Sequence, residues 1–429
     1  MDFATSEHGG DGRTPGPGPG SGPAPAPVAL TGARFHGDPA ALYRALRREH
    51  GEVVPVLLDG DVPAWLVLGY RELHQVTSDP ELFSRDSGLW NQWPNIPADW
   101  PLLPVISRKQ PSILGSVGER HRRRAALLGE ALEAVDAFTL RGHAERFADE
   151  LLDAVCGAGR ADLVAQYAAL LPVRVLAYLF GFPEEQGPDL VAALTDILDG
   201  QGRAQAAEAR LTAAMTRLVA ERRERPADDV VSRLLVNASG HGFSVEEVTH
   251  DVMVMLAAGH QPTTDWIGNS LRLMLTDERF AASLFGGRSS VAEAMNEVLW
   301  EDAPIQNAAG RWLSRDTRLG GRALRAGDLV VLGLQGANSD PRVRTHGSAL
   351  TGGNNAHFSF GHGEHRCPFP AREIAEVIAR TGIEVVLDRL PDLDLAVPRE
   401  NLVRRPSPWL RGLVELPVRF SPSPAVGGR

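Results

Sequence analysis

The 429-residue sequence has few cysteines, almost no lysine and no long uninterrupted apolar run. Its two cysteines, Cys156 and Cys367, are too few for the disulfide framework of a small secreted domain. Because no stretch of about 18 apolar residues occurs, we expect no membrane-spanning helix and no membrane partner. The chain starts with acidic and then Gly/Pro-rich sequence, without the basic start and apolar core of a secretory signal. Together these absences favour a cytoplasmic protein.

The charged residues show a second imbalance. Lys109 is the only lysine, so 43 of the 44 basic residues are arginines. The 54 acidic residues outnumber them and give a formal net charge of −10, which argues against a nucleic-acid partner. Hydrophobic residues make up 43% of the chain, enough at this length to bury a core without disulfide or metal support.

Composition divides the chain into a body and two tails. Residues 1–29 are rich in glycine and proline, and we predict that they form a disordered tail. Residues 421–429 form a second, short tail. The body, residues 30–420, is long enough for up to three domains at roughly 150 residues each. It contains no visible repeat.

The hydrophobic pattern of the body predicts mainly α-helix with a minor β portion. A helix is expected at 38–50, a β-hairpin at 53–68 and mostly helix over 119–275. The longest helix, 244–275, is apolar almost all round in its middle, which predicts that it runs through the core, and Pro262 is its one strong breaker. Short strands are expected near 311–319 and 329–334, and a last long helix follows Cys367.

An irregular segment, residues 84–118, contains Trp90, Trp93 and Trp100. Segments of this length without a period are uncommon in compact proteins unless they are functional. The tryptophans would either line a pocket for flat or aromatic ligands or hold the segment by packing, and the sequence does not decide between these interpretations.

The most informative segment, residues 358–371, surrounds the second cysteine. Two glycines allow a tight loop, and Pro368 and Pro370 stand where a helix would begin. A cysteine at a helix N-terminus beside His365 and Arg366 would have a stabilised thiolate, which suits it to bind a cofactor.

Two other interpretations of this cysteine are open. One is a small, buried core residue, and the other is a zinc site. A thiolate-bound cofactor is favoured over zinc because the loop is built to present one cysteine. The zinc ligands would be His357, His362, His365 and Cys367.

The pattern Phe360-Gly361-x-Gly363-x-His365-x-Cys367 resembles the cysteine loop of the cytochrome P-450 (haem-thiolate) superfamily. Residues 256–264 resemble the central distal helix of that family, Glu297 stands where its ExxR element begins, and residues 338–341 resemble the segment that leads into its meander. The resemblance covers roughly 33–420. It implies one catalytic domain with a long central distal helix and a Cys loop before the last long helix.

The resemblance also implies a cofactor and an electron source. Haem b (heme b) would be bound, with the Cys367 thiolate as the axial ligand of its iron. Electrons would come from a ferredoxin and its ferredoxin reductase, since the chain has no flavin or iron–sulfur domain of its own. Acidic carriers of this kind would be received at the arginines near His121. His121, Arg311 and His365 would hold the haem propionates, and Arg124 would replace an arginine that the family often has at the position of Ala125. The other implied cofactor-binding residues are Ala258, Gly259, Phe360 and Gly361.

The ExxR element reads Glu297-Val298-Leu299-Trp300 and so lacks its arginine. A minority of actinobacterial members look similar, and an arginine-rich, lysine-poor composition fits such a high-GC source. A buried Glu297 without a partner would be costly. We therefore expect Arg342, Arg344 or the Trp300 indole N–H to take the place of the missing arginine.

The distal helix departs from the family in its proton relay. Gln261 and Pro262 stand where the family usually has an acid and a threonine. Thr263 or His260 would have to take over the relay, or water would carry the protons past a helix kink at Pro262. Near the cysteine, Pro368 and Pro370 have no N–H to donate to the sulfur, so the thiolate should be electron-rich.

The resemblance predicts an enzyme that oxidises a small molecule in bacterial specialised metabolism. The reaction would be hydroxylation or, because the relay is altered, oxidative C–C or C–N coupling of aromatic rings. The rival hypothesis is a haem-binding auxiliary protein that steadies a partner enzyme. A zinc-dependent protein is the third.

Overall fold

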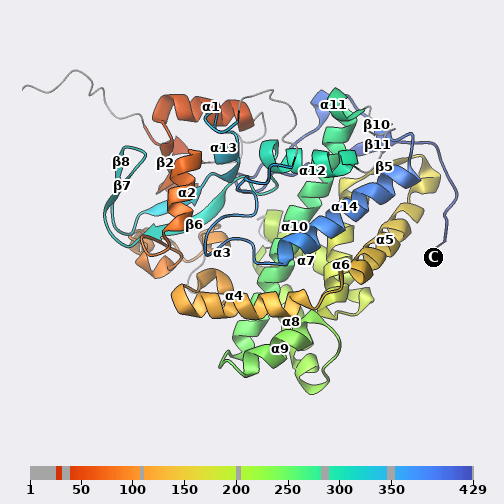
Figure 1. The fold of residues 1–429 in the computed structure, drawn as a ribbon, viewed down its shortest axis with the longest axis horizontal. Helices are drawn as coiled ribbons and strands as arrows, with labels where there is room; N and C mark the ends of the chain where they lie inside the picture. The colour runs from red at the N-terminus through yellow and green to blue at the C-terminus, as the bar shows by residue number, and fades with distance from the viewer. Residues whose placement is uncertain are drawn as a thin grey trace, which may run out of the picture.

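The computed structural model describes residues 26–30, 39–106, 111–199, 204–281, 289–344 and 353–427. Figure 1 shows a sheet-containing part that carries α1 and α2 and a larger helical part arranged around α10. The fold is mainly α with a minor β portion, as predicted. None of the described helices is both long and apolar enough to cross a membrane.

The helices follow the predicted pattern, and α10 confirms the long central helix. A capping box formed by Ser244 and Glu247 starts it, and it continues through Pro262 to Thr276. The helices are α1 Pro39–His50, α2 Tyr70–Ser78, α3 Leu103–Ile106, α4 Gly118–Glu133, α5 Ala137–Asp153, α6 Leu170–Phe180, α7 Gly187–Asp199, α8 Ala204–Glu224, α9 Val230–Ser239, α10 Val245–Thr276, α11 Glu278–Ala281, α12 Ser289–Glu301, α13 Leu334–Asn338 and α14 Ala371–Arg389.

The main sheet has the order β1-β2-β3-β9-β6-β4. The predicted hairpin is present as β2 and β3, and the predicted strands near 311–319 and 329–334 are β6, β7 and β9. Two small sheets have the orders β10-β11-β5 and β7-β8. The strands are β1 Val28–Ala29, β2 Val53–Leu58, β3 Val62–Val67, β4 Phe83–Ser84, β5 Arg160–Asp162, β6 Ala308–Leu313, β7 Thr317–Leu319, β8 Arg322–Leu324, β9 Leu329–Leu332, β10 Asp394–Leu395 and β11 Pro417–Arg419.

The two predicted tails have different outcomes. Strand β1 pairs with β2, so Val28 and Ala29 of the predicted tail 1–29 belong to the sheet; residues 1–25 lie outside the described part of the chain. The C-terminal residues 421–427 form no helix or strand, but the Ser423 N–H donates to the Cys156 carbonyl. This contact places the C-terminal segment against the body.

The tryptophans of segment 84–118 pack together beside the sheet. The ring centroids of Trp90 lie 4.9 Å from Trp93, 5.8 Å from Trp100 and 6.5 Å from Trp312 of β6. Trp90 and Trp100 are buried. These contacts support the packing interpretation of the segment.

Candidate functional site

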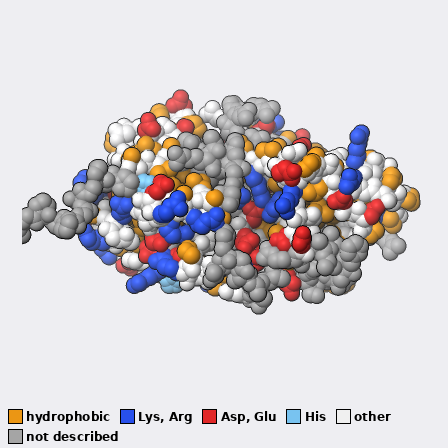
Figure 2. All heavy atoms as spheres, turned by 90° about the horizontal axis from the view of Figure 1, so that it is seen from above, with side chains coloured by type: hydrophobic (Ala, Val, Ile, Leu, Met, Phe, Trp, Pro, Cys, Tyr) orange, Lys and Arg blue, Asp and Glu red, His pale blue; other side chains and the backbone are white. Residues whose placement is uncertain are grey.

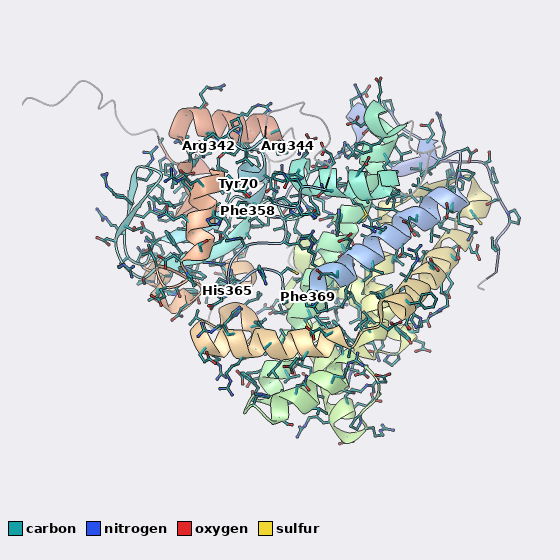
Figure 3. All side chains as sticks on the ribbon, in the orientation of Figure 1. Tyr70, Arg342, Arg344, Phe358, His365 and Phe369 are labelled. Atoms are coloured by element: carbon teal, nitrogen blue, oxygen red, sulfur yellow. The ribbon has the colours of Figure 1, made fainter. Side chains whose placement is uncertain are left out.

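The loop before α14 folds back on itself and presents Cys367. The Cys367 N–H donates to the Phe360 carbonyl (2.8 Å), and the Gly361 N–H donates to the Phe358 carbonyl (2.7 Å). Gly363 has a φ of +73°, and a Cβ there would lie 2.0 Å from the Thr77 carbonyl oxygen of α2. Only glycine fits this position. Figure 3 shows the loop, with His365 and Phe369 labelled, between α2 and the start of α14.

The expected stabilisation of a free Cys367 thiolate is wrong. Burial raises the pKa of the thiol to about 11, and Glu373 adds to this increase. Helix α14 begins at Ala371, four residues further on, and the field of a helix end falls off within about one turn. Binding to a metal ion would therefore have to remove the proton. Over the described residues no N–H donates to Sγ, and the thiol itself donates to the Pro368 carbonyl at 4.0 Å.

Four cationic or titratable side chains gather beside this loop. The rings of His121 on α4 and His365 lie 4.0 Å apart. Arg311 of β6 is buried, and Arg85 follows β4. Burial lowers the pKa of all four groups, that of Arg85 to about 10, and the charges of Arg85 and Arg311 further lower the pKa of His365.

The two arginines of this cluster have no anion of their own in the described part of the chain. Arg85 donates to the carbonyls of Ala309 (2.9 Å) and Gly310 (3.2 Å), and Arg311 donates to Gly310 (3.2 Å). Neither has a carboxylate within 4 Å among those residues. Glu364, 4.0 Å from His365, also pairs with Arg122. Buried cations without partners are costly, so this cluster suits an acidic ligand such as the two propionates of haem.

The sequence predicted three members of this cluster and missed Arg85. The register explains its position: Phe83 pairs with Leu313 and Ser84 with Trp312, so Arg85 follows the strand opposite Arg311. A pairing between residues so far apart in the sequence could not be derived from local patterns.

Arg124, in contrast, does not belong to the cluster. Its guanidinium contacts Asp251 (2.7 Å) and Glu247 (3.3 Å) of α10 and donates to the Pro111 carbonyl. These carboxylates already neutralise Arg124, which argues against the prediction that it holds a propionate. Burial raises the pKa of Asp251 to about 6 despite this arginine.

Helix α10 has an accessible stretch in its middle. Ala257 and Ala258 are exposed, whereas Leu256 and His260 on either side are buried, so there is space beside the helix at this point. Gly259 does not face that space, since a Cβ on it would lie 3.0 Å from Leu176 of α6. The predicted cofactor contact therefore fits Ala258 and not Gly259.

The candidate relay residues lie on different sides of α10. His260 is about 200° around the helix from Ala258, and its Nε2 lies 2.9 Å from the Ala169 carbonyl. His260 therefore faces away from the accessible stretch. Its pKa is lowered to about 4, mainly by burial, so the imidazole stays neutral near pH 7. Thr263 is buried, about 140° from Ala258. Gln261 donates from Nε2 to Asp265 Oδ1 (2.8 Å), and Pro262 lies beside it without breaking the helix.

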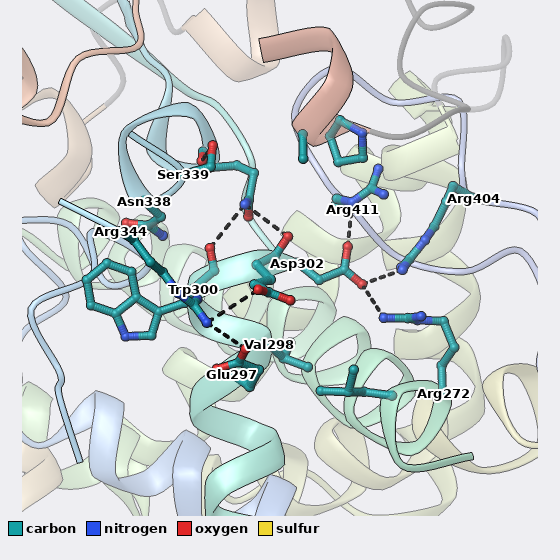
Figure 4. A pocket seen from close by; sticks show the side chains of 15 residues that line it. Arg272, Glu297, Val298, Trp300, Asp302, Asn338, Ser339, Arg344, Arg404 and Arg411 are labelled. Atoms are coloured by element: carbon teal, nitrogen blue, oxygen red, sulfur yellow. Dashed lines mark hydrogen bonds and ion pairs between the residues drawn. The ribbon is translucent and has the colours of Figure 1, made fainter. Parts of the chain in front are cut away.

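The ExxW element of α12 keeps its glutamate paired. Arg344 contacts Glu297 at 2.6 Å (Figure 4). Of the three expected replacements for the missing arginine, Arg344 is therefore the one that pairs with Glu297. Arg342 instead contacts Asp340 at 2.6 Å. The Trp300 indole N–H donates to the Asn354 carbonyl (2.9 Å) and not to Glu297.

The proposed zinc ligands do not converge. His357 packs against Trp300, His362 lies 3.0 Å from Thr77 Oγ1, and His365 packs against His121. Within the described ranges no group of three or more His, Cys, Asp or Glu side chains could hold a metal ion.

Comparisons with known proteins, by sequence and by structure, find relatives that cover nearly the whole chain. No family model matches the chain. It is 30% identical over 416 residues to the cytochrome P450 monooxygenase PikC of Streptomyces venezuelae, covering 94% of this chain and 96% of the relative. It is also 30% identical to the vitamin D(3) 25-hydroxylase of Pseudonocardia autotrophica, covering 92% and 97%. The solved structure of CYP154C4 from Streptomyces sp. W2061 matches with a TM-score of 0.83 at 26% identity, covering 94% of this chain and all of the other.

Proposed function

Because the chain belongs to the cytochrome P450 family, we propose that Cys367 binds the haem iron and that the enzyme oxidises a small molecule of bacterial specialised metabolism. Bound haem would supply the iron at which dioxygen is reduced. The observation that carries this proposal is the Cys367 loop beside a buried cationic cluster with no carboxylate partner for its arginines in the described residues.

The residues around the site would have separate tasks. Arg85, Arg311, His121 and His365 would hold the propionates and so fix the orientation of the cofactor. The Phe360 ring lies under the Arg372 guanidinium, 5.0 Å from its Cζ, and keeps the loop packed. Ala258, whose side chain is small and exposed, would leave room for the ligand at the iron.

Hydroxylation is the reaction that we favour. The names of two relatives describe a monooxygenase and a hydroxylase. Oxidative coupling of aromatic rings, suggested by Gln261 and Pro262, is the alternative, and analysis of the products separates the two: hydroxylation adds an oxygen atom from dioxygen, whereas coupling joins two rings without adding one.

A ferredoxin and its reductase would supply the electrons. Arg120, Arg122 and Arg123 of α4 are exposed, and Arg122 contacts Glu364 of the Cys367 loop. An acidic carrier would be attracted to this surface.

The first test is the spectrum of the reduced, CO-bound protein in wild type and two cysteine variants. We expect the Soret band of a thiolate-bound haem in wild type and in Cys156→Ala, and its loss in Cys367→Ala. Cys156 is buried and far along the chain from the loop, so it is the matched control. A protein without haem, or a band that survives Cys367→Ala, would contradict the proposal.

Turnover separates the enzyme from an auxiliary protein. With a surrogate ferredoxin, its reductase and NADPH, we expect ferredoxin-dependent consumption of dioxygen by wild type and none by Cys367→Ala. A haem-loaded wild type that consumes no dioxygen under these conditions would favour the auxiliary role.

A further inference from the structure

One stripe of α10 is polar although it lies in the core. Gln261, Asp265, Asn269 and Arg272 follow one another at intervals of four, four and three residues, which places them on one face of the helix. Gln261 and Asp265 are 3% exposed and Asn269 is fully buried. Buried polar groups cost desolvation energy, so an apolar stripe would pack here at lower cost.

Asp265 is the acid of this stripe, one turn beyond Gln261. Its Oδ1 accepts from Gln261, and its Oδ2 is buried with no hydrogen-bond partner. Gly412 is packed so closely that a Cβ there would lie 2.0 Å from Oδ1. Arg404 and Arg405 of the same loop favour the ionised carboxylate.

Burial outweighs those arginines. It raises the pKa of Asp265 to about 7, and the nearby charge of Asp302 acts in the same direction. An acid with a pKa near neutrality can both hold and release a proton under ordinary conditions, which is what proton delivery requires.

The stripe continues to a cavity at the surface of α12. The Asn269 amide donates to the carbonyls of Asp302 (3.0 Å) and Arg411 (2.7 Å), and its oxygen accepts from Arg404 (2.5 Å). Asp302 in turn holds Arg272, Arg404 and Arg411. These three arginines line a cavity of about 350 Å³ (Figure 4). Asp265 thus lies between this cavity and Gln261.

The other end of the stripe meets the accessible stretch of the helix. Pro262 has no N–H, so the Ala258 carbonyl loses its helical hydrogen bond and becomes an acceptor for water. Gln261 and Ala258 are three residues apart and share a face.

We propose that Asp265 is the proton-holding residue of the distal site, taking the place of the acid that Gln261 has replaced. The proposal rests on the proposed function. In the step, the O–H bond of the Asp265 carboxyl breaks and its proton passes to a water molecule near Gln261, leaving a carboxylate that the charges of Arg405 and Arg404 stabilise. A proton from a cavity water restores the carboxyl, so no electrons are exchanged. Asp265 delivers its proton through water while the Gln261 amide holds its carboxyl in place, so it is a positioning residue and not a catalytic residue.

The test compares haem-loaded wild type, Asp265→Asn and Asp251→Asn. Asp251 is the matched control, because it is also a buried aspartate of α10 but lies 14 residues earlier in the helix and pairs with Arg124. Infrared titration follows the C=O stretch of protonated carboxyl groups, and we expect a component that titrates near pH 7 in wild type and Asp251→Asn but not in Asp265→Asn.

The second readout is the solvent isotope effect on dioxygen consumption with the surrogate ferredoxin system. Loss of a positioned proton donor typically slows such steps by about 100-fold or more, so we expect at least a ten-fold slower rate and a larger isotope effect in Asp265→Asn. Unchanged rate and isotope effect, or a carboxyl component that still titrates near pH 7 in Asp265→Asn, would overturn the proposal. The separate component of Asp251, whose pKa is raised to about 6, is identified by its loss in Asp251→Asn. Failure of the proposed function would show separately, as absence of the thiolate-haem band in wild type.

Discussion

Trp300 lies on α12 between the Glu297–Arg344 pair and the backbone of Asn354. Its indole N–H donates to the Asn354 carbonyl, and the Arg344 guanidinium carbon lies 5.8 Å from its ring centre. An arginine at position 300 would add a second buried positive charge next to Arg344. The indole supplies a donor and a π face without adding that charge beside the Glu297–Arg344 pair.

We expect Trp300→Phe to lower the free energy of unfolding by about 1 kcal/mol, because an aromatic ring is kept but the Asn354 carbonyl loses the indole donor and keeps only the Asn296 amide. Urea titration of the purified protein measures this. Trp312→Phe is the control, since its buried indole N–H has no hydrogen-bond partner to lose. Equal losses of unfolding free energy in the two variants would contradict a stabilising hydrogen bond from Trp300 to Asn354.

Arg85 carries the second prediction at this scale. Arg85→Leu should weaken haem binding by roughly ten-fold or more, because a charge-assisted hydrogen bond contributes about 1.5–3 kcal/mol. In the haem-free protein the substitution relieves repulsion between Arg85 and Arg311 but also removes the hydrogen bonds to the Ala309 and Gly310 carbonyls, so urea titration of the haem-free variant accompanies the affinity measurement. Haem transfer to apomyoglobin measures the affinity. Arg123→Leu, on the exposed side of α4, should leave it unchanged; an equal effect there would contradict the role of Arg85.

Predictions for single residues succeeded where the neighbouring sequence alone determines the position of the residue. The loop pattern located Cys367, and Arg344 was among the expected partners of Glu297. Arg124 and Arg85 were misjudged or missed because their partners come from α10 and β6, far away in the sequence. The thiol pKa was misjudged because the burial of Cys367 depends on the whole fold.

At the scale of elements, α10 was predicted almost to the residue. Its start follows from the Ser244 and Glu247 capping box, a local signal, and its apolar middle predicted its place in the core. The directions of its faces could not be predicted. His260 and Gly259 turn toward α6, whereas Ala258 faces the accessible side, and this depends on how α6 and α10 pack.

Pro262 is the element-scale test of that helix. Pro262→Ala restores an N–H to the Ala258 carbonyl and should raise the free energy of unfolding of the haem-free protein by about 1–3 kcal/mol. Pro172→Ala is the control, because Pro172 lies in the first turn of α6, where proline is tolerated. Denaturant titration compares the two, and a gain no larger at position 262 than at position 172 would contradict this account.

For the whole molecule, the net charge of −10 says little about where charge matters. Basic and acidic side chains are interspersed on the face seen in Figure 2. The charges beside Cys367 and around Asp302 are buried instead. Two arginines near Cys367 lack a carboxylate partner in the described part of the chain, while Asp302 holds three arginines together beside the cavity. Their arrangement depends on strands and helices that only the folded chain brings together.

The buried aspartates should shape the pH dependence of stability in opposite directions. Arg404, Arg411 and Arg272 hold the pKa of Asp302 well below its usual range, so its contribution is present above about pH 4 and is lost on acidification. The pKa of Asp265 is raised from 3.8 to about 7, so the folded state binds a proton that the unfolded state releases. The contribution of Asp265 is therefore complete below about pH 4 and is lost as the pH rises toward 7.

Asp265→Asn isolates the second effect, because an amide does not titrate and has nearly the shape of the protonated acid. The difference in unfolding free energy between the variant and wild type should change in favour of the variant as the pH rises from 4 to 8. About three pH units between the two pKa values correspond to roughly 4 kcal/mol at most. Urea titrations of both proteins at several pH values measure the difference, in which the contribution of Asp302 cancels. A difference that stays constant with pH would show that Asp265 is ionised in the folded protein, and that it cannot serve as a proton-holding group near neutrality.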